Sequence, residues 1–473
     1  MDLFRKKSVD QLVSESTPLK RTLKTFDLTM LGIGAIIGTG IFVLTGKGAL
    51  TAGPALCVSF LLAAVCCGFA GLCYAEFAAM APVSGSAYSY AYLAFGELIA
   101  FVIGWDLILE YALQAATVSA GWSGYFNKLL EGFGLHLPVE LTAAYGTTPG
   151  VTTYFNLPGF VIVLIITWVL SIGINQTKKT NDIMVMIKLA IIVLFIVCTV
   201  WYINPANWKP FSPYGIYTFQ PGSTQPYGIV PAASIVFFSF IGFDAVSSSA
   251  EETINPNKTL PRGILISLAV STVLYIIMTL IMTGVVPYKE FAKFIDAPVA
   301  GVILETGLNW LAFIVNLGAL IGMTTVMLVQ LYGQSRICYA MSRDGLFPKF
   351  FGEVHPKYRT PFKGTWFFGI LTAIAGGFIN INVLFELVNI GTLSAFIIVS
   401  AGILWMRKTQ PHRGFRAPGV PFTPICAIIF CLILIFGLNW ETWVRFAVWF
   451  ALGLVVYFTY SRKHSQLNEP GLF

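Results

Sequence analysis

The stretch LGIGAIIGTGIF, residues 31–42, decides how the rest of the chain is interpreted, because glycines interrupt an otherwise apolar run. The glycines are Gly32, Gly34, Gly38 and Gly40. Glycine lowers helix propensity, so an apolar helix gains from this pattern only where its backbone must approach another group closely. Three groups can make such an approach: a neighbouring helix, a phosphate or a bound substrate.

The glycine spacing excludes the two common phosphate-binding motifs. It misses the dinucleotide fingerprint GxGxxG by one residue and also departs from the spacing of the P-loop. Packing against another helix through Gly34 and Gly38 stays open, and so does a helix that unwinds and directs backbone N–H groups at an anion. Thr39 followed by Gly40 favours unwinding, because helix packing needs no hydroxyl there.

The composition is that of a membrane protein. Of the 473 residues, 56% are hydrophobic and 11% are charged, against about 25% charged residues in soluble domains. Long apolar runs recur without the two-residue alternation of a β-barrel, so we expect an all-α membrane protein with twelve transmembrane helices. The expected spans are residues 27–47, 54–80, 88–122, 158–177, 182–202, 228–250, 261–285, 299–340, 363–379, 384–406, 422–438 and 442–461.

The positive charges predict the orientation of these spans. With both termini on one side, 22 of the 29 Lys and Arg residues fall on that side and five fall on the other. Loops rich in Lys and Arg stay in the cytoplasm, so both termini are predicted to be cytoplasmic. This distribution explains the net charge of +7 without a nucleic-acid partner. The basic N-terminal region lacks the short apolar core of a secretory signal peptide.

A second interruption, FFSFIGFDAV at residues 237–246, lies in the sixth expected span. Each interruption opens a set of five spans, and five is odd, so the two sets should enter the membrane from opposite sides as a 5+5 inverted repeat. Paired interruptions of this kind indicate the binding site of a secondary transporter, with helices one and six broken. The predicted division is a cytoplasmic N-tail (1–26), a first repeat (27–202), a second repeat (228–406), two peripheral helices (422–461) and a cytoplasmic C-tail (462–473).

The polar groups expected at the two interruptions suit a zwitterion. Unwinding at Gly242 would free backbone carbonyls, which must face a cavity rather than lipid. These carbonyls belong to Phe238, Ser239 and Ile241. They would accept hydrogen bonds from an ammonium group, while N–H groups near Thr39 would meet a carboxylate. A simple glycine kink is the alternative, and Asp244 in the same span argues against it, because a lone carboxylate is costly there.

Ionisable side chains inside the expected spans are Glu76, Asp106, Glu110, Lys188, Asp244 and Glu386. Lys188 either snorkels to the cytoplasmic interface or holds a fixed cation against the first broken helix. In the second case it could replace a bound sodium ion or release its proton during transport. The histidines all lie outside the middle of the spans, so a proton relay must use carboxylates or this lysine. Gln330 either makes an interhelical hydrogen bond or lines a pocket.

Four segments carry a family resemblance: LGIGAIIGTGIFVLTG (31–46), YAEFAAMAPVSGSAYSY (74–90), FFSFIGFDAVSSSAEETINPNKTLPRGI (237–264) and MSRDGLFPKFFGEVHPKYRTP (341–361). In this order they resemble the amino acid–polyamine–organocation (APC) superfamily, and within it the bacterial members of the cationic amino acid transporter (CAT) family. The resemblance implies a LeuT-like fold, in which two inverted five-helix repeats enclose a central site, and secondary transport of free amino acids.

The resemblance also implies roles for individual residues. The substrate would bind at Ile36, Gly38, Thr39, Gly40, Phe238, Ser239, Ile241, Phe243 and Gln330, with Phe243 as part of a gate. Proton coupling would use Lys188, Glu110, Asp244 and Tyr275, with Tyr275 as the partner of Asp244.

We therefore expect a proton-coupled symporter that imports small neutral L-amino acids across the plasma membrane by alternating access. Transport of arginine and lysine, or amino acid exchange, is the alternative; Glu110 is the one obvious carboxylate for a cationic side chain. A channel would line its pore with rings of charges or carbonyls, and a sensor that binds without transporting would carry the same motifs. No catalytic motif indicates an enzyme.

The expected partners are the free L-amino acid, protons and the lipid bilayer, without nucleic acid. No cofactor and no metal site are expected. The chain is predicted to be a monomer, and the sequence does not indicate whether it has a small membrane subunit.

Overall fold

The computed structural model describes residues 3–7, 21–81, 86–147, 152–173, 178–223, 225–409 and 414–468. The rest of the predicted N-tail, and residues 469–473 of the predicted C-tail, lie outside this part of the chain.

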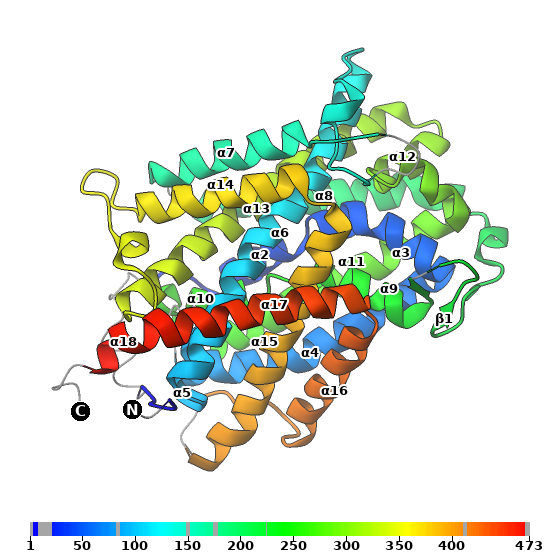
Figure 1. Cartoon of the computed structure of the whole chain (residues 1–473). Coiled ribbons are helices and arrows are strands. Elements are labelled where there is room, and N and C mark those ends of the chain that lie inside the picture. The colour runs from blue at the N-terminus through cyan, green and yellow to red at the C-terminus, as the bar shows by residue number, and fades with distance from the viewer. Residues whose placement is uncertain are drawn as a thin grey trace.

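Long helices packed side by side form the body of the molecule (Figure 1). They are α4 (Leu56–Met80), α6 (Glu97–Gly132), α8 (Lys178–Thr199), α11 (Pro256–Val285), α13 (Asn309–Arg343), α14 (Phe362–Phe378), α15 (Ile381–Thr409) and α17 (Trp440–Val456). Shorter α-helices are α2 (Thr25–Ile36), α3 (Thr45–Ala52), α5 (Ser86–Ala94), α7 (Leu157–Ser171), α9 (Ile229–Val236), α10 (Ala245–Ser248), α12 (Pro298–Glu305), α16 (Phe422–Phe436) and α18 (Arg462–His464).

Single turns of other helix types join these elements. Two are π-helical, η1 (Gly40–Leu44) and η10 (Tyr457–Ser461). The 3₁₀ turns are η2 (Gly53–Ala55), η3 (Val139–Leu141), η4 (Val200–Tyr202), η5 (Pro205–Trp208), η6 (Phe237–Phe240), η7 (Ala250–Glu252), η8 (Tyr288–Phe294), η9 (Lys349–Gly352) and η11 (Gln466–Asn468). Strands β1 (Thr218–Phe219) and β2 (Pro226–Tyr227) pair antiparallel in the loop before α9.

The helices have the length and composition that a membrane requires. In the described part of the chain, eight helical segments are long and apolar enough to cross a bilayer; they include residues 229–247 and do not include α14. The helices α2, α7 and α16 are shorter apolar helices. The prediction of a predominantly helical membrane protein is confirmed at this level.

Two of the expected spans are wrong as single helices. Residues 88–122 are divided between α5 and α6, and residues 299–340 are divided between α12 and α13. The divisions occur at Gly96 (φ 95°) and Gly307 (φ 77°). A residue with positive φ cannot continue a right-handed helix, so the chain turns at both glycines.

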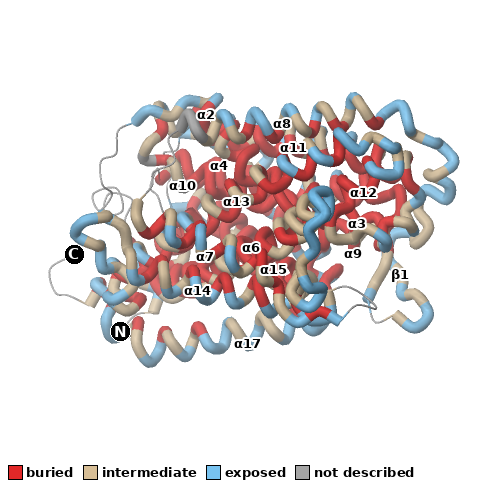
Figure 2. Tube along the Cα trace, turned by 90° about the horizontal axis from the view of Figure 1, so that it is seen from above, coloured by how far each residue is buried: buried red, intermediate tan, exposed pale blue. Residues whose placement is uncertain are grey.

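Buried residues concentrate in the middle of the bundle, and α17 lies at its edge (Figure 2). The most hydrophobic window of residues 229–247 is 89% buried, whereas that of residues 440–464 is 17% buried. The interrupted segment around α9 is therefore a core element. Exposed apolar side chains on the outer helices, such as Leu452 and Val455 of α17, are typical of surfaces that contact lipid.

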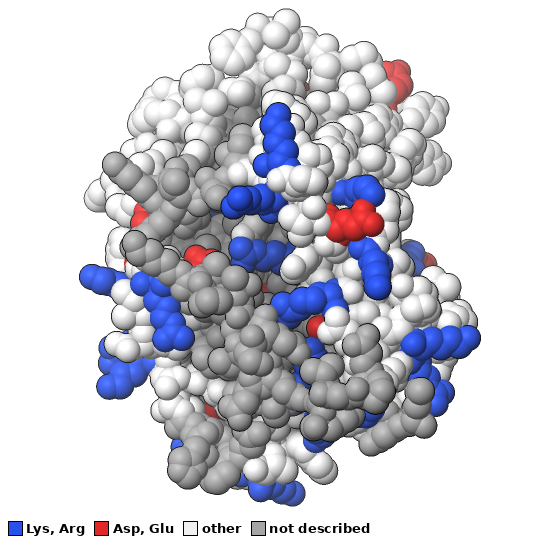
Figure 3. Space-filling model, turned by 90° about the vertical axis from the view of Figure 1, so that its left-hand side faces the viewer, with Lys and Arg blue, Asp and Glu red and all other residues white. Residues whose placement is uncertain are grey.

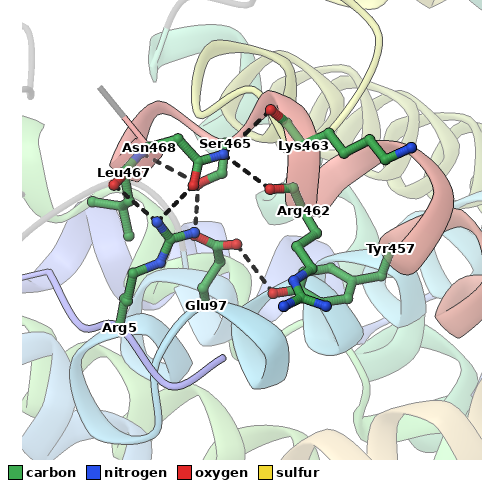
Figure 4. A network of polar contacts seen from close by, with 8 residues as sticks. All are labelled: Arg5, Glu97, Tyr457, Arg462, Lys463, Ser465, Leu467 and Asn468. Carbon is green, nitrogen blue, oxygen red and sulfur yellow. Dashed lines mark hydrogen bonds and ion pairs between the residues drawn. The ribbon is translucent and has the colours of Figure 1, made fainter. Parts of the chain in front are cut away.

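Both ends of the described chain lie at the same end of the bundle (Figure 1), and Lys and Arg side chains gather there (Figure 3). Glu97, at the start of α6, joins the two terminal segments (Figure 4). Its carboxylate pairs with Arg5 Nη2 at 3.0 Å and accepts hydrogen bonds from Ser465 Oγ at 2.6 Å and Tyr457 Oη at 3.1 Å. Lys7 pairs with Asp344 at the end of α13, with Nζ and Oδ1 3.0 Å apart.

Candidate functional site

The first interruption is a true break in the helix. The α-helix α2 ends at Ile36 and a π-helical turn begins at Gly40, with residues 37–39 between them. Close packing requires a glycine at position 38, because a Cβ atom added there would lie 2.9 Å from Val326 Cγ2 on α13. The chain leaves the helix at Ile37 and Gly38, so the unwinding favoured by the sequence is present directly before Thr39 and Gly40.

The second interruption breaks the chain between η6 and α10. Gly242 has φ 120°, a backbone conformation that side chains rarely adopt, and an added Cβ would lie 2.9 Å from the carbonyl oxygen of Ala35. Position 242 therefore requires glycine for two reasons: its φ is positive, and another backbone segment approaches it closely. The group that approaches it is the end of α2, which means that the two interruptions meet.

Direct contact between the two breaks is closest at Gly40. A Cβ atom added to Gly40 would overlap with Cα and Oγ of Ser239 and lie 2.5 Å from its Cβ. Tyr275 on α11 bridges the same two segments from the side. Its hydroxyl lies 3.0 Å from the carbonyl oxygen of Ile36 and 2.9 Å from that of Ser239.

Several buried polar atoms around the breaks have no hydrogen-bond partner within the described part of the chain. They include Thr39 Oγ1, Ser239 Oγ and both amide atoms of Gln330, in residues that are at most 1% exposed. Buried polar atoms in proteins are almost always paired, so unpaired groups that cluster in one place need an explanation. A ligand bound between the breaks would supply the missing partners.

Lys188 extends from α8 into the first break. Its ammonium group donates hydrogen bonds to the carbonyl oxygens of Gly34 at 2.9 Å and Ile37 at 3.2 Å, and its side chain is fully buried. The last carbonyls of a helix lack intrahelical partners and carry partial negative charge, which a cation neutralises. The snorkelling alternative is therefore excluded, and Lys188 caps the end of α2.

The other predicted coupling residues lie in a separate group between α6 and the second break. Asp244 accepts a hydrogen bond from Tyr111 Oη at 3.5 Å, and Glu110, the neighbour of Tyr111, has one carboxylate oxygen without a partner. The predicted pairing of Asp244 with Tyr275 is not present, because the Tyr275 hydroxyl bonds the carbonyls of the breaks instead. Among the described residues, Lys188 has no carboxylate within ion-pair distance.

The remaining predicted substrate residues are buried at the second break with different neighbours. The Phe238 carbonyl accepts the Ile241 N–H at 3.3 Å. The Phe243 ring packs on Tyr74 of α4 and Phe396 of α15, at centroid distances of 5.8 and 5.1 Å. The gate role of Phe243 stays a prediction.

Helix packing explains Gly34, the glycine for which that alternative stayed open. A Cβ atom added to Gly34 would lie 2.8 Å from Val185 Cγ2 on α8. This close contact brings α8 near enough to α2 for Lys188 to reach the break.

Two acids from the expected spans have structural partners. Glu76 accepts two hydrogen bonds from Arg407, at 2.9 and 2.7 Å, at the terminal end of the bundle. Glu386 accepts hydrogen bonds from Asn439 at 2.8 Å and Thr442 at 2.6 Å. Neither acid faces the breaks.

A cavity of about 620 Å³ opens at the end of the bundle opposite the termini. Its lining includes Val43, Gly121, Lys47 and Asp296. A Cβ atom added to Gly121 would lie 2.8 Å from Thr39 Cγ2, so the cavity ends beside the first break while the polar atoms of the breaks stay buried beneath it. Burial raises the pKa of the Asp296 carboxyl, and the positive charge of Lys128 offsets part of this shift.

Tyr111, which bonds Asp244 of the second break, and Gln114 are further buried polar residues of α6 that the sequence did not single out. Gln114 is 2% exposed and its Oε1 atom has no partner among the described residues. The signal available in the sequence was its position one helical turn after Glu110, inside an apolar span. In the described part of the chain, no cluster of three or more His, Cys, Asp or Glu residues is placed to hold a metal ion.

A helical bundle of this apolar composition, with two breaks that hold unpaired polar groups in its core, defines a membrane transport protein for small solutes. The family model described as amino acid permease matches residues 23–459, and the chain belongs to this family. The predicted membership of the APC superfamily is thereby confirmed.

Three relatives show the range of this similarity. The chain is 55% identical over 472 residues to the branched-chain amino acid permease BcaP of Bacillus subtilis, with 99% of each chain covered. It is 48% identical over 472 residues to the methylthioribose transporter of the same organism, again with 99% of each covered. It is 32% identical over 519 residues to the chloroplastic cationic amino acid transporter 9 of Arabidopsis thaliana, covering 95% of this chain and 89% of the relative.

Proposed function

We propose that this chain is a proton-coupled secondary transporter that imports small neutral L-amino acids across the plasma membrane by alternating access. One observation carries the proposal. The two helix breaks touch at Gly40 and Ser239, and each break holds a buried hydroxyl that has no partner among the residues that the structure describes.

The chemistry of the two breaks suits the two charged groups of an amino acid. The hydroxyl of Thr39 and the first N–H groups of the segment that starts at Gly40 would bind the carboxylate. The Tyr275 hydroxyl has one hydrogen for two carbonyls, those of Ile36 and Ser239, so one of them always keeps its lone pairs available. The substrate ammonium would donate to that carbonyl and to the carbonyl of Ile241 in the second break.

The proposed architecture is the twelve-span fold with two inverted five-helix repeats. The breaks occur in the first element of each repeat. The third elements, α6 and α13, are 36 and 35 residues long. They contact each other with residue numbers that run in opposite directions, as between Trp122 and Thr324 and between Ile108 and Gln334. An inverted repeat brings corresponding helices together in this antiparallel way.

Alternating access is supported by the difference between the two ends of the bundle. The terminal end is tied by the Arg5–Glu97 and Lys7–Asp344 pairs, while a cavity reaches toward Thr39 from the other end. Because Lys and Arg gather at the terminal end, we assign that end to the cytoplasm. The cavity then faces the outside. An importer has this arrangement when its cytoplasmic end is closed and its outer end is open to the substrate.

Proton coupling is assigned to Lys188, which holds the carbonyls at the end of α2. Release of its proton would weaken those two hydrogen bonds and loosen the break. A lysine shifts its protonation readily when buried, which makes it suitable for such a step.

A small neutral substrate agrees with the described relatives. The BcaP relatives are described as branched-chain amino acid permeases, which agrees with a neutral substrate. The methylthioribose transporter, at 48% identity, makes this sugar the second candidate.

Uptake by the purified protein in proteoliposomes tests the proposal. Each of the twenty amino acids and methylthioribose competes with a labelled neutral amino acid, with and without a pH gradient. We expect small neutral L-amino acids to compete and the gradient to drive their accumulation. Competition by methylthioribose alone, or by arginine and lysine alone, would overturn the substrate assignment, and uptake without response to the gradient would overturn proton coupling.

A further inference from the structure

The chain after α17 lies at the end of the bundle where both termini are located (Figure 1). In this segment the Ser465 hydroxyl donates to the Glu97 carboxylate at the start of α6, with Oγ and Oε2 2.6 Å apart. The next residue, Gln466, donates its backbone N–H to the carbonyl oxygen of Asp344 at the end of α13, at 3.1 Å. We call residues 461–468 the C-terminal strap, because they join the ends of two separate long helices.

The backbone that follows α13 allows the strap to approach closely. Gly345 has φ 76°, and a Cβ atom added there would overlap with the carbonyl oxygen of His464. A glycine at this position therefore lets the two backbones meet. The Ser461 hydroxyl fastens the beginning of the strap by donating to the Leu346 carbonyl at 2.6 Å. The strap thus contacts the end of α13 at several points.

One guanidinium group joins the strap to the N-terminal segment (Figure 4). Arg5 Nη1 donates to the Leu467 carbonyl at 2.9 Å and to Asn468 Oδ1 at 2.7 Å. The other terminal nitrogen, Nη2, pairs with Glu97 at 3.0 Å. The Asn468 amide also donates to the Arg462 carbonyl at 2.9 Å, which closes the strap into a turn. Both terminal segments are thereby fixed to α6 and to each other.

The strap holds together elements that must separate when the terminal end opens. The helices α6 and α13 flank the first break, because Gly121 meets Thr39 and Val326 meets Gly38. The polar atoms of the breaks are buried, so a solute reaches the terminal end only after the surrounding helices part. The strap opposes this movement, because it is bonded to α6, to α13 and to the N-terminal segment at once.

We infer that the C-terminal strap is an autoinhibitory contact that holds the terminal end closed, and that its release controls how often the carrier opens to the cytoplasm. This inference rests on the alternating access of the proposed function. Glu97 and Ser465 are both buried, and a hydrogen bond to a carboxylate is stronger than one between neutral groups. Loss of one such bond changes an equilibrium constant about tenfold.

Two cysteine reporters distinguish opening of the terminal end from loosening of the whole fold. Ser247 is buried in α10, between the second break and α5, where its hydroxyl lies 3.4 Å from that of Ser86. Ser59 is buried near the opposite end of the bundle, where it donates to the Ile229 carbonyl at 2.9 Å. A carrier that opens more often at the terminal end exposes Ser247→Cys alone, whereas a loosened fold exposes Ser59→Cys as well.

The variants Ser465→Ala and Asn468→Ala weaken the strap, and Thr459→Ala is the matched control. In the described part of the chain, the Thr459 hydroxyl donates only to carbonyls of the preceding turn, so its loss leaves the strap intact. Each variant is combined with each reporter and labelled in membrane vesicles with a water-soluble maleimide. Protein without a reporter gives the background of the native cysteines, and a thermal midpoint verifies folding.

We expect both strap variants to raise the labelling rate of Ser247→Cys about tenfold and to leave that of Ser59→Cys unchanged. The Thr459→Ala control should keep both rates. An unchanged rate at Ser247→Cys in both strap variants, or an equal increase in the control, would overturn the inference. An increase at both reporters would mean that the fold is loosened, and it would overturn the inference as well.

Uptake of L-alanine by the wild type is measured in the same vesicles, which separates this inference from the proposed function. Absence of uptake would contradict the proposed substrate. The labelling rates do not depend on which solute the protein carries, so they would still decide whether the strap holds the terminal end closed.

Discussion

Replacement of Gly40 by alanine is the sharpest perturbation of the contact between the two breaks. The new Cβ would overlap with the Cα and Oγ atoms of Ser239 and lie 2.5 Å from its Cβ. A side-chain oxygen can rotate away, but a Cα atom belongs to the backbone of the second break, so the breaks themselves must separate. Overpacking of this kind costs about 1–3 kcal/mol, which corresponds to about 5- to 150-fold in an equilibrium constant.

Because Gly40→Ala changes the distance between the groups that bind the two ends of the substrate, we expect the loss to appear mainly in apparent affinity. The assay is the concentration dependence of L-alanine uptake in proteoliposomes. Gly68→Ala in α4 is the control, since nothing lies within 4 Å of the Cβ it adds. Wild-type affinity in Gly40→Ala, with Gly68→Ala also unchanged, would refute the reasoning that the two breaks form one site.

Three further substitutions probe other contacts. Lys188→Ala should abolish accumulation driven by a pH gradient, and accumulation at the wild-type level would contradict its coupling role. Tyr275→Phe leaves two carbonyls of the breaks without their donor and should lower stability by about 1–3 kcal/mol; an unchanged thermal midpoint would argue against this bridge. Burial raises the pKa of Asp296, so its ionised form destabilises the folded state at neutral pH and this cost disappears as the pH falls below the ordinary carboxyl pKa. Asp296→Asn should therefore raise the thermal midpoint at pH 7 but not at pH 3.5, which is about half a unit below the ordinary pKa of an aspartate. An equal effect at both pH values would contradict the raised pKa of Asp296.

The two breaks could be predicted because glycine clusters and an acid stand out in apolar runs. Gly38–Gly40 and Gly242 are located where the sequence analysis expected unwinding. The turns at Gly96 and Gly307 were not predicted, because a single glycine is compatible with a helix, and the polar residues beside them, Glu97 and Glu305, also occur within helices.

The partners of the polar residues depend on how helices pack, and a single sequence does not determine this. Lys188 can reach a membrane interface or a neighbouring helix with the same long side chain, and only the packing of α8 at Gly34 decides between them. Likewise, the apolar pattern of the span does not show whether Gln330 and Gln334 are paired. The register between α6 and α13 leaves Gln330 unpaired in the described part of the chain and brings Gln334 within hydrogen-bond distance of the Ile108 carbonyl.

The central claim, that the paired breaks bind both charged groups of a free amino acid, is tested most directly by counterflow of labelled L-alanine in proteoliposomes. Unlabelled L-alanine, L-alaninamide and N-acetyl-L-alanine are the competitors, because the amide removes the carboxylate and the acetyl group removes the ammonium. The account predicts that L-alanine competes and that neither derivative does. Equal competition by L-alaninamide would contradict the assignment of the carboxylate to Thr39 and Gly40, and equal competition by N-acetyl-L-alanine would contradict the role of the carbonyls at the breaks.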